Sequence, residues 1–158
     1  MAYDVTTTPA VGNATKRSDY VRLRDAVKAV SQRTYFLGGD LQTFITDTAF
    51  VDHPYAFEVE VDFTNISGLS AYLEVNGACQ TTSAVTGTIK SQYWDGAAWQ
   101  DITGASVALA LTTAFARVRG KSLITPPVVG VVPVKFVFKG SVGAANPIAG
   151  AAWLSIRG

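Results

Sequence analysis

Hydrophobic and polar residues alternate along much of the chain beyond residue 40. In the stretch YAFEVEVDF, residues 55–63, hydrophobic side chains occupy every second position, and Glu58, Glu60 and Asp62 lie between them. A period of two is typical of a strand with one buried face. The same pattern predicts further strands at residues 71–76, 86–94, 99–103, 106–111, 114–119, 131–139 and 152–157. Residues 41–50 are an additional candidate.

Turn-forming residues separate these segments. They are Ser67-Gly68, Asn76-Gly77, Asp95-Gly96, Gly120, Pro126-Pro127, Gly140 and Asn146-Pro147. Roughly seven to nine short strands at about ten-residue spacing are typical of an antiparallel β-sandwich or jelly roll. We therefore expect a mainly β protein whose sheet domain covers residues 40–158.

Before residue 40 the hydrophobic period is helical. Ser18 is a favourable N-cap, and Gly38-Gly39 can end a helix, so residues 18–39 are predicted to be a helix and linker. Hydrophobic side chains spaced by three, four and three residues form one face of this helix: Tyr20, Leu23, Val27 and Val30. This face either packs on its own domain or meets copies of itself in an oligomer.

Residues 1–17 have no hydrophobic period. They are rich in Thr, Gly, Asn and Ala, a composition that cannot build a core. We predict that this segment is an extended arm in front of the helix. It does not have the basic and then apolar pattern of a signal peptide, and no apolar stretch is long enough for a membrane span, so we expect a soluble protein made without export.

The charge composition narrows the classes of partner. Thirteen basic and twelve acidic residues give a net charge of +1, so no broad field attracts nucleic acid or a membrane surface. Charged residues make up only 16% of the chain, against about 25% in typical soluble domains. A surface so poor in charge favours a homo-oligomer or an assembly that covers part of it.

Candidate catalytic chemistry is sparse. His53 is the only histidine and Cys79 the only cysteine, so a nucleophile–base pair has one candidate and a zinc cluster lacks ligands. The carboxylates between residues 58 and 62 lie on a single strand face, where a solvated surface is the ordinary interpretation. We therefore expect a non-enzymatic protein without metal or cofactor.

A small basic edge is formed by Arg117, Arg119 and Lys121. These side chains, and two further cations at Lys135 and Lys139, could dock against an acidic partner surface. They lack the aromatic interleaving that single-stranded nucleic acids require, so no nucleic acid is expected.

The segment QYWDGAAWQDI, residues 92–102, has two interpretations. In one, the residues DGAA form a four-residue hairpin loop and Trp94 pairs with Trp99 across it. In the other, Tyr93, Trp94 and Trp99 form a platform for a glycan. Its polar partners would then be Gln92, Gln100 and Asp101.

Two motifs carry a resemblance to a known class. GNATKRSDYVRLRDAV, residues 12–27, resembles the N-terminal segment of virion structural proteins of tailed bacteriophages, and WDGAAW is similar to turns in phage fibre and appendage domains. The resemblance implies a capsid decoration or head appendage protein that forms a trimer, contacts major capsid or other virion proteins and is assembled in the bacterial cytoplasm. The alternative is a tail-fibre or spike module that binds a host surface glycan.

Overall fold

The computed structural model describes residues 21–23, 26, 32–141 and 147–158 of the chain. It is mainly β, and the strands pair in antiparallel fashion. Among the described residues, only those at 21–23 and 26 are helical. The strands are β1 (Arg33–Ile45), β2 (Val51–Asp52), β3 (Val59–Asp62), β4 (Ser70–Cys79), β5 (Val85–Trp94), β6 (Trp99–Leu111), β7 (Val118–Ile124), β8 (Val131–Gly140) and β9 (Ile148–Arg157).

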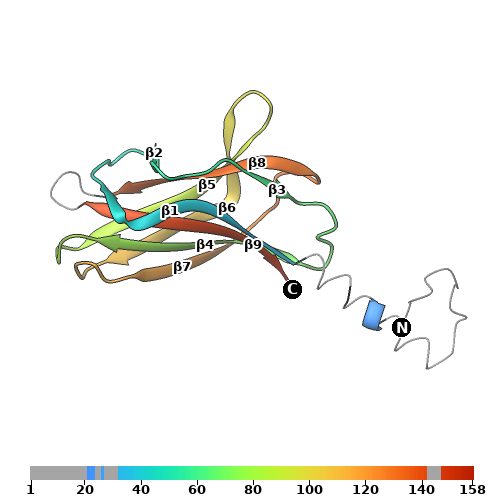
Figure 1. The fold of residues 1–158 in the computed structure, drawn as a ribbon, viewed down its shortest axis with the longest axis horizontal. Coiled ribbons are helices and arrows are strands. Elements are labelled where there is room, and N and C mark those ends of the chain that lie inside the picture. The colour runs from blue at the N-terminus through green and yellow to red at the C-terminus, as the bar shows by residue number, and fades with distance from the viewer. Residues whose placement is uncertain (1–20, 24–25, 27–31, 142–146) are drawn as a thin grey trace, which may run out of the picture.

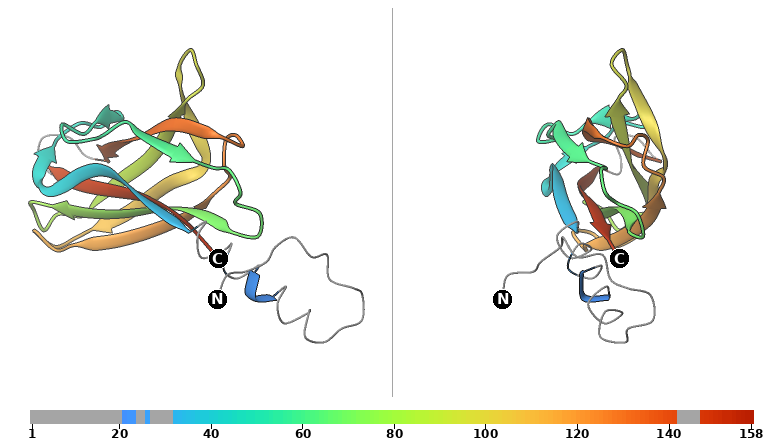
Figure 2. Two further views of the ribbon diagram at one scale, coloured as in Figure 1. Left: turned by 45° about the vertical axis from the view of Figure 1, so that its right-hand side comes forward. Right: turned by 90° about the vertical axis from the view of Figure 1, so that its right-hand side faces the viewer.

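The strands form two sheets, which lie one over the other as two layers (Figures 1 and 2). One sheet, here called sheet A, has the order β1-β9-β4-β7. The other, sheet B, has the order β2-β8-β5-β6, with β3 also paired to β8. Because β1 begins beside the end of β9, with Arg33 opposite Ile156, the chain enters the domain close to its C-terminus.

Side chains from both sheets share one hydrophobic core. Leu73 and Leu154 reach it from sheet A, and Phe136 and Phe138 reach it from sheet B; all four are fully buried. Burying a side chain of this size contributes about 1.5–3 kcal/mol relative to its exposure. The alternation seen in the sequence therefore separates core residues from the outer faces of the two sheets.

The prediction that Gly38-Gly39 end a helix is wrong, because residues 33–45 form strand β1. Both glycines have positive φ, +104° and +85°, and they mark a register shift in the pairing of β1 with β9. The carbonyl of Tyr55 accepts a hydrogen bond from the Gly39 N–H. These glycines thus allow a neighbouring segment to approach the strand closely.

Several other predicted boundaries move. The strand expected at 55–63 begins only at Val59, and 114–119 is replaced by β7; the segments 99–103 and 106–111 are one strand, β6. Asn76-Gly77 and Gly120 do not form turns, since they lie inside β4 and β7. A Cβ at Gly120 would lie 2.4 Å from the Val107 Cγ1, so this glycine allows close packing of β7 on β6.

The predictions for 86–94 and 131–139 are confirmed by β5 and β8. The predicted arm, residues 1–17, lies outside the described residues. Of the predicted helix face, only Leu23 is described, and it is half-buried within the short helical stretch. Tyr20, Val27 and Val30 lie outside the described residues, so their role stays a prediction.

Candidate functional site

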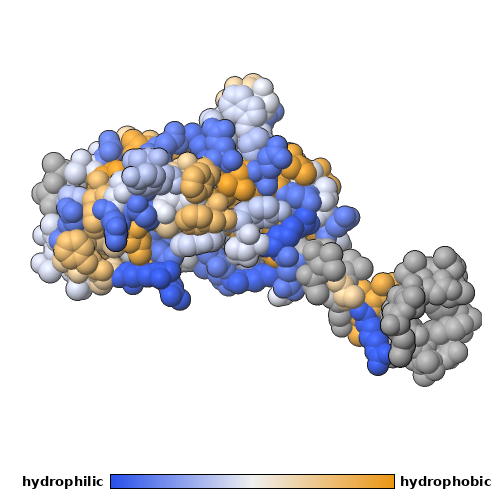
Figure 3. Space-filling view, in the orientation of Figure 1, coloured by the Kyte–Doolittle hydropathy of each residue, from blue (hydrophilic) through white to orange (hydrophobic). Residues whose placement is uncertain are grey.

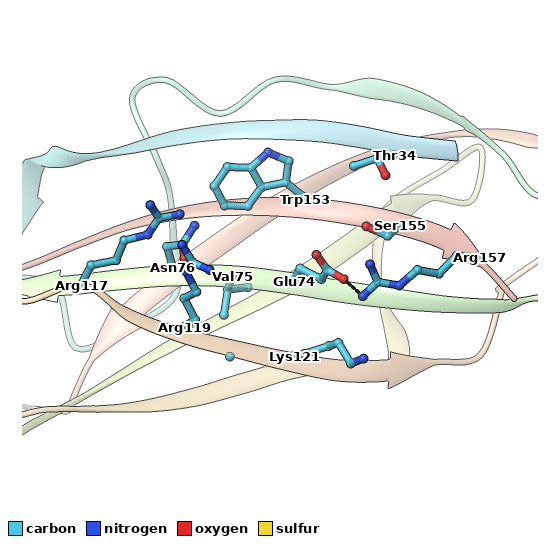
Figure 4. A pocket seen from close by; sticks show the side chains of 11 residues that line it. Thr34, Glu74, Val75, Asn76, Arg117, Arg119, Lys121, Trp153, Ser155 and Arg157 are labelled. Carbon is cyan, nitrogen blue, oxygen red and sulfur yellow. Dashed lines mark hydrogen bonds and ion pairs between the residues drawn. The ribbon is translucent and has the colours of Figure 1, made fainter. Parts of the chain in front are cut away.

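A shallow trough of about 600 Å³ lies on the outer face of sheet A (Figure 4). Leu73 and Val75 of β4 face the core, so the alternation places Glu74 and Asn76 outward on the trough floor. Glu74 pairs in register with Lys121 of β7 and with Trp153 of β9. The trough therefore has a cationic side on β7 and an aromatic side on β9.

Positive charge dominates the trough. Arg117, Arg119 and Lys121 come from β7 and the residue before it, and Arg157 comes from the end of β9. Glu74 is the one carboxylate in the lining, and it forms an ion pair with Arg157. A chain with a net charge of only +1 thus gathers four cations around a single neutralised carboxylate.

Tyr72 organises two of these cations. The Lys121 Nζ lies 4.2 Å from the centroid of the Tyr72 ring, and the Arg157 guanidinium carbon lies 5.4 Å from it. Both distances fall within the range of cation–π attraction. Tyr72 therefore holds the lysine and the arginine near each other without neutralising either charge.

An aromatic patch, defined as Phe36 and Phe57, adjoins the trough, and Phe36 also contacts Trp153 in the trough wall. The rings of Phe36 and Trp153 are 5.2 Å apart, and those of Phe36 and Phe57 are 6.1 Å apart. Phe36 is 43% exposed and Phe57 52% exposed. Figure 3 shows apolar side chains reaching the surface between hydrophilic ones on this view of the molecule.

Part of this site was predicted from the sequence. The basic edge of Arg117, Arg119 and Lys121 was identified there, and the structure places all three side chains along the trough. Trp153 on β9 and Asn76 on β4 were not identified, because each lies more than 30 residues from the basic edge in the sequence. Their contribution depends on strand order, which a local pattern does not reveal.

The predicted β5–β6 hairpin has the four-residue loop that was expected. Trp94 pairs with Trp99 across it, and their rings lie 5.6 Å apart in an edge-to-face arrangement. Gly96 has φ +101°, and the Asp95 Oδ1 accepts hydrogen bonds of 2.8 Å from the N–H groups of Ala97 and Ala98. The hairpin projects from the domain (Figures 1 and 2).

The polar groups proposed as sugar contacts around the hairpin have partners within the protein. The Gln100 amide donates to Asp95, and the Gln92 amide donates to Asp101. Asp101 also forms an ion pair of 2.7 Å with Lys90. Tyr93 is half-buried and packs on the core. These contacts favour the structural interpretation of the hairpin.

His53 lies in the loop directly after β2, and its side chain is buried. It is 3% exposed, its ring lies 5.0 Å from the ring of Phe138, and its Nδ1 accepts a hydrogen bond from the Tyr55 N–H at 3.0 Å. Burial lowers the pKa of His53 despite the opposing effects of the Asp40 carboxylate and a Thr43 backbone contact. The Cys79 sulfur, also buried, points to the Thr81 carbonyl at 2.9 Å.

The three carboxylates Glu58, Glu60 and Asp62 differ in their contacts. Glu58 and Glu60 are exposed, while Asp62 forms an ion pair with Arg33 and accepts hydrogen bonds from Thr64. The bonds from Thr64, more than the arginine, hold the pKa of Asp62 below its usual value. No set of three metal-binding side chains gathers among the described residues.

Comparison with known proteins adds no relative. No protein-family model matches this chain, and no curated protein matches it. In the part of the chain that the structure describes, no helix has the length and apolar character needed to cross a membrane.

Proposed function

We propose that this chain is a non-enzymatic structural protein of a tailed-bacteriophage particle, which it decorates or stabilises through protein–protein contacts. It assembles in the bacterial cytoplasm as a trimer with major capsid or other virion proteins as partners. The resemblance of residues 12–27 to phage virion proteins suggests the class. Two features of the fold support it.

The first supporting feature is the strand order, which we interpret as a jelly roll. The antiparallel pairs β1–β9, β4–β7 and β5–β6, together with β8 beside β2 and β3, are nested within one another along the chain. Such an arrangement corresponds to one long hairpin rolled into two layers, an architecture found in viral capsid domains and lectins. Fold alone does not identify function, so a surface feature has to carry the proposal.

The observation that carries the proposal is the aromatic patch. Phe36 and Phe57 are about half exposed and contact each other at the edge of sheet A. Contiguous apolar side chains that face solvent mark contact surfaces for other proteins, and aromatic side chains are enriched in the cores of such contacts. The patch is therefore assigned to contact with a neighbouring virion subunit.

Incorporation into particles tests this assignment. A virus that lacks the gene is complemented with the wild-type chain, with Phe57→Ser or with Val129→Ser, and the copies per purified particle are counted by quantitative mass spectrometry. We expect Phe57→Ser to reduce incorporation at least tenfold, about 1.4 kcal/mol of binding. Val129 is 90% exposed but lies in the loop between β7 and β8, so its variant should incorporate normally.

Two results would contradict the proposal in different ways. Equal incorporation of Phe57→Ser and the wild-type chain would remove the patch from the contact. Absence of the wild-type chain from purified particles would remove the virion assignment itself. Sedimentation equilibrium of the free protein checks the trimer, for which a mass of three times 16.7 kDa is expected.

The glycan-binding alternative keeps one specific observation in its favour. The β5–β6 hairpin projects from the domain, and Trp94 at its base is 36% exposed. If this hairpin binds a host glycan, Trp94→Ala abolishes attachment to cells while particle assembly continues. If it is structural, the same change lowers the melting temperature and leaves attachment unchanged.

A further inference from the structure

The trough on sheet A contains polar side chains that lack partners. In the part of the chain described here, Arg117 and Arg119 form no ion pair or hydrogen bond, and the Lys121 ammonium makes a cation–π contact with the Tyr72 ring. Unpaired cations that face one hollow favour an anion there, because their mutual repulsion falls when it binds.

The floor of the trough carries neutral polar side chains. Asn76 and Ser155 are only 5% and 2% exposed, and both line the trough. Among the described residues, the buried polar atoms that lack a partner are the His53 Nε2 and the Ser91 Oγ, and neither lies in the trough. The Asn76 amide and the Ser155 hydroxyl therefore offer hydrogen-bonding groups to a ligand in the trough without themselves requiring one.

The opposite side of the trough is aromatic. Trp153 lies across Glu74 from Lys121 in the register of sheet A, and contact with the Phe36 ring fixes its orientation. A ligand in the trough therefore meets a flat apolar surface on one side, a row of cations on the other and hydrogen-bonding groups beneath it.

We propose that the trough binds a carboxylated saccharide. The C–H face of a sugar ring can stack on Trp153, and its carboxylate can form paired hydrogen bonds with Arg117 or Arg119. Its hydroxyl groups can form hydrogen bonds with Asn76 and Ser155. The volume of about 600 Å³ lies within the usual range of ligand sites and suits a short oligosaccharide.

The trough is less suited to an acidic peptide. Extended peptides gain affinity by adding to the edge of a sheet through main-chain hydrogen bonds. The floor strand β4 lies between β9 and β7, and β9 lies between β1 and β4, so their backbone groups are already paired. The trough offers side-chain groups alone, in an arrangement that matches the two faces and the hydroxyls of a sugar.

Binding is tested by isothermal titration calorimetry of the full chain with three carboxylated probes: trigalacturonic acid, 3′-sialyllactose and a chondroitin tetrasaccharide. Maltotriose is the neutral comparison and hexaglutamate the peptide comparison. We expect at least one carboxylated saccharide to bind at least tenfold more tightly than either comparison. Failure of all three saccharides to bind would overturn the proposal, as would hexaglutamate binding equally well.

Variants then locate the site. Arg119→Gln removes a cation from the exposed end of a side chain and should weaken binding at least tenfold without changing the melting temperature. Lys139→Gln removes the same charge from sheet B, where Lys139 lies 4.7 Å from the Phe50 ring, and should bind normally. Equal weakening by both variants would mean that net charge, and not the trough, attracts the probe.

Two further variants separate this site from the hairpin. Trp153→Ala should abolish saccharide binding, and Trp153→Phe, which keeps an aromatic face, should restore part of it. Trp94→Ala changes only the projecting hairpin and should bind like the wild-type chain. Loss of binding in Trp94→Ala, with Arg119→Gln unaffected, would move the saccharide from the trough to the hairpin.

Discussion

Gly38 is a position where a single added methyl group should disturb the molecule. Its φ is +104°, and a Cβ there would lie 2.2 Å from the Tyr55 carbonyl oxygen and 2.9 Å from the Ala56 Cα. Gly38→Ala therefore has to push residues 55–57 away from β1. Because Phe57 belongs to this segment, the aromatic patch should loosen with it.

The magnitude follows from what must move. A residue with a side chain at positive φ costs about 1–2 kcal/mol. The displaced segment also holds the hydrogen bonds Gly39 N–H to Tyr55 O and Phe57 N–H to Leu37 O, each 2.9 Å long. At about 0.5–1.5 kcal/mol for each bond, the full effect of Gly38→Ala is a loss of about 2–5 kcal/mol.

Gly96→Ala is the matched control. Gly96 has φ +101°, nearly the value at Gly38, but an added Cβ there meets nothing within 4 Å. This variant should therefore show the backbone cost alone, about 1–2 kcal/mol. Equilibrium unfolding in urea measures both free energies, and equal slopes against urea confirm that the variants unfold alike. If Gly38→Ala costs no more than Gly96→Ala, the close approach of residues 55–57 to β1 is wrong.

Three further predictions concern the hairpin and the buried histidine. Trp94→Ala and Trp99→Ala should show a coupling of about 0.5–1.5 kcal/mol in a double-mutant cycle; additive effects would exclude their edge-to-face contact. Hydrogen bonds, chiefly from the Ala98 N–H, lower the pKa of Asp95, so its stabilising effect exists above the unfolded pKa and disappears as pH falls. The stability difference between wild type and Asp95→Ala should thus shrink below about pH 4, and a constant difference would contradict this. Burial lowers the pKa of His53, so the unfolded chain takes up a proton first and stability falls below about pH 6.5; His53→Phe should lack this fall, and an unchanged profile would refute it.

The sequence predicted strands where neighbouring side chains alternate strictly between core and solvent. Residues 86–94 are such a segment and match β5; residues 131–139 match β8, although Phe136, Val137 and Phe138 are buried one after another. The first part of strand β1 was missed because the two glycines resemble a helix end, whereas its residues 41–45 lie within the strand candidate at 41–50. Only their positive φ and the approach of Tyr55 reveal a strand with an irregular register.

Turn signals failed where a glycine serves packing. Gly77 lies inside β4, where an added Cβ would be 2.8 Å from the Leu109 Cδ1 of β6. Glycine at this position therefore allows the two sheets to pack closely. The hairpin loop was predicted correctly because Asp95 and Gly96 act through bonds within the loop itself. The trough was only half predicted, since Trp153 joins Arg119 through strand order and not through sequence spacing.

Imaging the protein on the particle tests the central claim most directly. A short epitope inserted between Val128 and Val129 lies in the exposed loop between β7 and β8 and can be labelled with gold on purified phage. We predict label distributed over the head, with none on particles from the untagged virus. Label confined to the tail tip would contradict decoration and favour host recognition, and intact particles without label would contradict the virion assignment.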